Sequence, residues 1–102
     1  MRDSVALLLQ RVERLPHTSQ GLTTIATVAA AAGKWDRAFA AGDSATTKSG
    51  SLDWIDQYPS VWKPVVADPR LQASCRLAKR DCGPVVRLIN AAIPLPAGIS
   101  PR

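Results

Sequence analysis

Apolar residues recur at intervals of three and four along most of this chain, which is the spacing of one face of an α-helix. No stretch alternates between apolar and polar residues as a half-buried strand does. The sequence therefore predicts an all-α fold, a compact bundle of four to five short helices. The predicted helices cover residues 4–15, 19–32, 34–45, 69–82 and 84–93, with two single turns, 52–58 and 59–64, between the third and the fourth.

Residues with strong backbone preferences mark the ends of several of these helices. Gly33 can end the second helix in the left-handed conformation, and the polar stretch 46–51 predicts a loop after the third. Asp68 at the N-cap and Pro69 at the first helical position predict the start of helix 69–82. An unbroken apolar stripe would then run along that helix through Leu71, Cys75, Ala78 and Cys82.

The length of 102 residues predicts one domain, because a chain of this size buries one core. We assign residues 1–93 to a single helical domain and residues 94–102, with three prolines in nine positions, to an extended tail. The sequence contains neither a secretion-signal pattern nor an apolar run of about 20 residues. We therefore expect a soluble cytoplasmic protein without a membrane partner.

The net charge of +5 resides in the last third of the chain, since residues 1–69 contain as many acidic as basic side chains. Arg76, Lys79 and Arg80 would share the face of helix 69–82 that lies away from its apolar stripe, and Arg87 follows on the next helix. Such a face can bind an acidic protein surface, or a nucleic acid as the alternative. It can also be only a solvated face near a helix C-terminus, where cations are favoured.

Residues 20–50 contain small and large apolar residues in a characteristic order. The positions are Leu22, Ile25 and Ala26 on the first helix, Gly33 and Trp35 at the turn, and Ala38 and Ala45 on the second. With these spacings the segment resembles a single helical hairpin of the tetratricopeptide kind, which implies protein binding. It departs from that family at Gly42, where a large apolar residue is usual, and near Gly50, where a proline is usual. The segment "WKPVVADPRLQ" (62–72) is also similar to the C-terminal ends of proteins built from such repeats.

The same residues allow a second interpretation. Val28 and Ala29, followed by Gly33, resemble the first helix and the turn of a helix-turn-helix, and Phe39 would be buried in its recognition helix. That helix contains few basic residues that could reach base edges. A third interpretation is an alanine-rich helix that ends at glycine for packing alone.

The residue types needed for catalysis or metal binding are not grouped in the sequence. Cys75 and Cys82 would lie about 10.5 Å apart on one helix, too far for a disulfide, so we expect two reduced thiols packed as small apolar groups. His17 is the single histidine, which argues against a zinc site. Asp53 and Asp56 have no neighbouring base or nucleophile in the sequence. We expect no enzyme, no metal and no cofactor.

The aromatic residues Trp54, Tyr58 and Trp62 recur at intervals of four, either for core packing or as a strip that anchors a partner. The interpretation that we favour is a non-enzymatic protein–protein interaction module: an adaptor, a chaperone or a small inhibitor of a larger macromolecular machine. The alternative is a small basic helix-turn-helix-like regulator that binds DNA or RNA, which would be a dimer. The sequence leaves the oligomeric state open. The expected contacts to a partner are Arg76, Lys79, Arg80 and Arg87, with Trp62 as an anchor.

Overall fold

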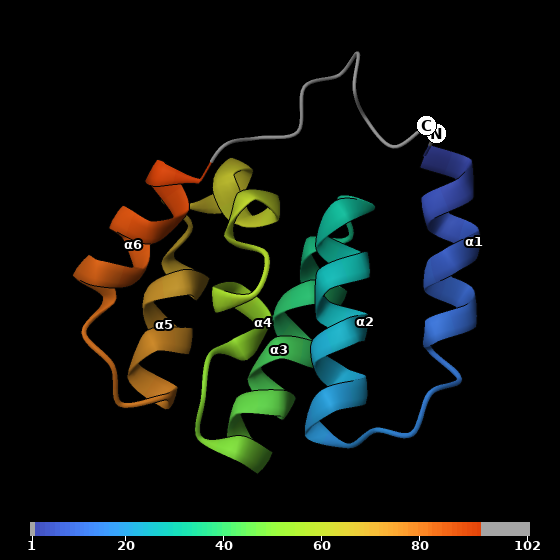
Figure 1. Cartoon of the computed structure of the whole chain (residues 1–102), viewed down its shortest axis with the longest axis horizontal. Helices are drawn as coiled ribbons and strands as arrows, with labels where there is room; N and C mark the ends of the chain where they lie inside the picture. The colour runs from blue at the N-terminus through green and yellow to red at the C-terminus, as the bar shows by residue number, and fades with distance from the viewer. Residues whose placement is uncertain (1, 93–102) are drawn as a thin grey trace.

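The computed structural model describes residues 2–92, with side chains described from residue 5 onward (Figure 1). Over these residues the chain is helical with no strand, so the all-α prediction is confirmed, while the number of helices exceeds the expected four to five because the two single turns are also helical. The proposed tail, residues 94–102, lies outside the described residues. The elements are α1 (Arg2–Val12), α2 (Ser19–Ala31), α3 (Trp35–Ser49), α4 (Asp53–Asp56), the 3-10 helix η1 (Pro59–Val65), α5 (Pro69–Leu77) and α6 (Cys82–Ala91).

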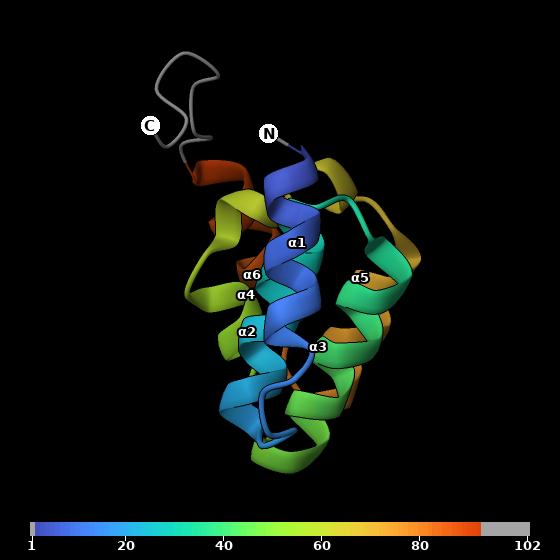
Figure 2. The same ribbon diagram turned by 90° about the vertical axis from the view of Figure 1, so that its right-hand side faces the viewer.

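The central unit is the antiparallel pair of α2 and α3 (Figures 1 and 2). Helix α1 packs along the far side of α2, and α5 packs against α3. Helix α6 closes the opposite edge of the molecule on η1 and α5 (Figure 1). Alanine supplies six of the buried residues of the central pair, and these small side chains let the two helices approach closely. These alanines are Ala26, Ala29 and Ala30 on α2 and Ala38, Ala41 and Ala45 on α3.

The large side chains of the core form one aromatic cluster. Trp54 and Trp62 pack with ring centroids 4.8 Å apart, and Phe39 packs edge-on to Trp62 at 5.4 Å. Both tryptophans are completely buried. The expectation that Trp62 anchors a partner is therefore wrong, because its ring fills the core and its Nε1–H donates to the Trp54 carbonyl oxygen at 2.9 Å. Only Tyr58 of the predicted aromatic strip is exposed.

Helix α3 is longer than its sequence predicts, because residues 46–49 continue the helix where we expected a loop. Thr46 is buried, and its hydroxyl accepts from Trp54 Nε1 at 2.9 Å and donates to the Ser51 carbonyl oxygen at 2.8 Å. The helix ends at Ser49, and Gly50 follows as its C-cap with a left-handed φ of 74°.

Helix α5 is shorter than its sequence predicts. It begins as expected, with Asp68 accepting from the Arg70 N–H, but it ends at Leu77 instead of residue 82. Lys79 takes a left-handed φ of 56°, and the Lys79 and Arg80 N–H groups donate to the carbonyl oxygens of Arg76 and Cys75. This is the Schellman arrangement that closes a helix, here with lysine at the position usually taken by glycine.

The early end of α5 overturns the expectation of two separate thiols. Because the chain reverses at residues 78–81, Cys82 begins α6 instead of continuing α5, and Asp81 caps the new helix. The Cα atoms of Cys75 and Cys82 are consequently 5.4 Å apart, and the two residues form a disulfide. The separation of about 10.5 Å expected along one helix does not apply, because the two cysteines lie on different helices.

Candidate interaction sites

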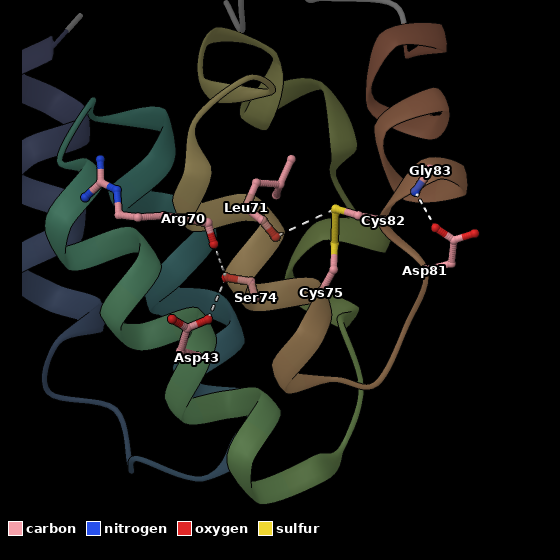
Figure 3. The surroundings of a disulfide bond; sticks show 8 residues. All are labelled: Asp43, Arg70, Leu71, Ser74, Cys75, Asp81, Cys82 and Gly83. Carbon is pink, nitrogen blue, oxygen red and sulfur yellow. Dashed lines mark hydrogen bonds between the residues drawn. A yellow bond between two sulfur atoms is a disulfide. The ribbon is translucent and has the colours of Figure 1, made fainter.

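The predicted basic residues gather at the turn between α5 and α6, which we call the basic corner: residues 76–83 and Arg87. The disulfide ties the last turn of α5 to the first turn of α6, and the Asp81 side chain accepts from the Gly83 N–H at 3.0 Å (Figure 3). The two sulfur atoms lie beneath the corner, as both cysteines are buried. A covalent bond and two helix caps therefore fix the backbone that holds the cations.

The four predicted contact residues of the corner differ in their electrostatic state. Arg80 Nη1 binds Asp56 Oδ2 of α4 at 2.8 Å, so this charge is compensated within the molecule. Arg76, Lys79 and Arg87 are exposed and take part in none of the ion pairs among the described residues. Three of the four predicted cations therefore have no ion-pair partner among the described residues.

Arg87 joins this group although it lies on a separate helix. A Cβ atom built on Gly83 would lie 3.6 Å from Arg87 Nη1 and 3.5 Å from Asp81 Oδ1. The guanidinium of Arg87 therefore lies over the first turn of α6, near the Asp81 carboxylate. Two leucines next to these cations in the chain are also exposed, Leu77 at 48% and Leu88 at 40%.

A second surface was not expected from the sequence. Three adjoining hollows follow the exposed face of α2, and we call them together the α2 groove. The central hollow, of about 340 Å³, is lined by polar side chains only, which come from α2, the end of α3 and α4. These residues are Ser19, Gln20, Thr23, Thr24, Ser49, Asp53 and Gln57.

The two flanking hollows share residues with the central one. One, of about 290 Å³, adds Thr27, Val28 and Tyr58, and the other, of about 360 Å³, adds Leu15 and Pro16. Sequence reasoning missed the groove because its lining consists of hydroxyl and amide side chains, which resemble an ordinary solvated helix face. Asp53, rejected above as half of an acid–base pair, lies in the central hollow, whereas Asp56 is bound to Arg80.

Charged pairs elsewhere hold the helices in place. Glu13 accepts from Arg37 Nε and Nη2 at 2.7 Å each, which ties the segment after α1 to α3. These hydrogen bonds hold the pKa of Glu13 below its ordinary value. On α3, Asp43 accepts from the buried Ser74 hydroxyl at 2.7 Å, and burial raises the pKa of Asp43 despite that bond (Figure 3).

No protein-family model, curated protein or solved structure matches this chain. The described residues contain no group of three side chains placed to hold a metal ion. Within residues 2–92 every helix falls short of the length and apolar character that crossing a bilayer requires. The resemblance of residues 20–50 to a tetratricopeptide hairpin stays a prediction.

Proposed function

We propose that this protein is a non-enzymatic protein-interaction module, in the manner of an adaptor or a small inhibitor, and that it binds an acidic partner at the basic corner. The observation that carries the proposal is the group of three exposed cations, Arg76, Lys79 and Arg87, on a backbone fixed by a disulfide. Fixing the backbone before binding lowers the entropy lost when a partner docks. Less of the binding free energy from these side chains is then offset by the entropy cost of ordering the backbone.

The exposed Leu77 and Leu88 favour a protein over a nucleic acid as the partner. A protein interface combines apolar side chains with a charged rim, whereas a nucleic-acid interface is more polar and more uniformly basic. Helix α3, the would-be recognition helix, also packs on both α2 and α5, and its Arg37 is bound to Glu13. These contacts speak against the helix-turn-helix alternative.

Fluorescence polarisation with a labelled glutamate- and leucine-rich peptide tests the proposal. The variant Arg76→Gln/Lys79→Gln/Arg87→Gln should weaken binding by at least about tenfold, because three charge-assisted contacts are lost. The matched control Arg11→Gln/Arg14→Gln/Lys48→Gln removes the same charge from other exposed positions and should change binding less than about threefold.

Equal losses in the two variants would mean that the peptide responds to net charge alone, which contradicts the assignment of the corner. A parallel titration with duplex DNA and single-stranded RNA addresses the alternative. Nucleic-acid binding that is tighter than peptide binding, and that weakens steeply with salt, would overturn the proposal in favour of a nucleic-acid regulator.

A further inference from the structure

The central hollow of the α2 groove has a chemical character opposite to that of the basic corner. Its volume of about 340 Å³ lies at the lower end of the range of ligand sites, roughly 300–1,000 Å³. Asp53 supplies a carboxylate, and the lining contains no lysine or arginine. Asp53 takes part in none of the ion pairs among the described residues.

Two of the four hydroxyl groups that line the hollow already donate their hydrogen within their own helix. Thr24 donates its hydroxyl hydrogen to the Gln20 carbonyl oxygen at 3.2 Å, and Ser49 donates to the Ala45 carbonyl oxygen at 2.9 Å. Because each hydroxyl has one hydrogen, neither can also donate to a ligand, and the Thr24 oxygen keeps a lone pair that faces the hollow. The Ser49 oxygen already accepts from the Ser51 N–H at 3.2 Å. Gln20 and Gln57 add amide oxygens. A carboxylate with acceptor oxygens beside it suits a ligand that carries positive charge and several N–H groups.

We propose that the central hollow binds the arginine side chain of an extended segment from a partner protein. A guanidinium has five N–H donors in a planar fork, so it can bind Asp53 and neighbouring oxygens at once, whereas a lysine ammonium has three donors around a point. The exposed ring of Tyr58 in the adjoining hollow offers a face on which a guanidinium or a peptide can stack.

The continuity of the groove identifies the occupant as a peptide segment. The groove follows α2 from Thr18 to Val28, a rise of about 15 Å along the helix. An extended chain advances about 3.3 Å per residue, so the groove accommodates four to five residues. The flanking hollows, with Val28 and Tyr58 at one end and Leu15 and Pro16 at the other, suit apolar neighbours of the arginine.

This site is independent of the basic corner, since the two share no residue and attract opposite charges. We therefore expect a probe of one site not to bind at the other. The probe is a capped pentapeptide with a central arginine and alanine on both sides, titrated into the full chain labelled with ¹⁵N and followed by NMR. We expect saturable amide shifts in residues 19–28 and 49–58, and none at residues 76–83.

The variant Asp53→Asn should weaken this peptide about three- to fivefold, the effect of losing one solvent-screened ion pair. The matched control Asp36→Asn, which removes a carboxylate that is exposed outside the groove, should leave the affinity unchanged. A second variant, Gln57→Ala, tests the hollow at a position where no carboxylate is lost and should also weaken the peptide. The spectrum of each free variant verifies its fold.

A pentapeptide with lysine in place of the central arginine should bind more weakly. Three outcomes would overturn the proposal. Equal affinity of the two peptides would show that the hollow responds to charge and not to a guanidinium. Equal binding of a central-glutamate peptide would exclude recognition of a cation. Shifts that are absent, or confined to the basic corner, would show that the groove holds no such segment.

Discussion

The disulfide between Cys75 and Cys82 should supply a large part of the stability of this small domain. In the chain-entropy model, closing a loop of eight residues lowers the entropy of the unfolded chain enough to stabilise the fold by about 2.5 kcal/mol. For a chain of this length, that difference corresponds to roughly 10–15 °C in Tm. The folded state loses little on reduction, because the Cys82 sulfur lies 3.8 Å from the Leu71 carbonyl oxygen and the new thiol can donate there.

The assay is thermal unfolding followed by circular dichroism, with and without an excess of a dithiol reductant. Thiol titration in denaturant verifies that the oxidised protein has no free thiol and that the reduced one has two. The control is Cys75→Ala/Cys82→Ala, whose Tm should be low and indifferent to the reductant. A change of less than about 3 °C on reduction of the native chain would refute the reasoning, as would two free thiols in protein purified under air.

Three further changes test the packing of α3 and the contact between Glu13 and Arg37. Gly42→Ala should lower the free energy of unfolding in urea by about 1–3 kcal/mol, because the added Cβ would lie 2.5 Å from the Trp54 ring. This clash outweighs the helix preference of alanine, which is roughly 1 kcal/mol. An increase in stability would contradict this packing. Thr46→Val should cost about 1–3 kcal/mol in the same assay, since the buried Trp54 Nε1–H loses its acceptor, and a neutral effect would exclude this hydrogen bond. Glu13→Gln should lose less than about 1 kcal/mol near pH 7. The pKa of Glu13 is lowered in the fold, so its contribution is complete above the ordinary value of 4.5, and the difference between native and variant should vanish as the pH falls through the lowered pKa; a difference that persists in acid would show that charge is not its source.

The sequence predicted those features of the fold that depend on local chemistry. The start of α2 at Thr18 and of α5 at Asp68 follows from side chains that accept from backbone N–H groups within three residues. Gly33 ends α2 in the left-handed conformation as expected, because glycine meets no steric penalty there. Such signals are read from a few adjacent residues, and tertiary contacts only reinforce them.

The errors occurred where distant contacts decide the local structure. Residues 46–49 are polar enough for a loop. Thr46 is nevertheless buried, and its hydrogen bonds to Trp54 and Ser51 hold the last turn of α3. Lysine rarely takes a left-handed φ, so nothing in the local sequence marked Lys79 as the end of α5. The bond between Cys75 and Cys82 requires that reversal, and helical periodicity carries no information about it.

The same distinction between local signals and distant contacts applies to the candidate sites. Arg76, Lys79, Arg80 and Arg87 could be proposed because an excess of one charge is visible in the sequence. Burial of Trp62 could not be distinguished from exposure, since the same spacing of aromatic residues serves a core and a docking strip. The α2 groove is assembled from three elements, and no single segment contains its pattern.

The basic corner and the α2 groove are joined through α4, which carries Asp53 into the groove and Asp56 to Arg80 of the corner. The Asp56–Arg80 pair is one connection through which occupation of one site can affect the other. The Asp56–Arg80 pair is more than one-third exposed on both sides, and such a pair contributes at most about 1 kcal/mol. Coupling carried by this pair is therefore limited to about fivefold in affinity. Through this pair the two surfaces are coupled only weakly, so we expect a partner that engages both to gain mainly from effective concentration.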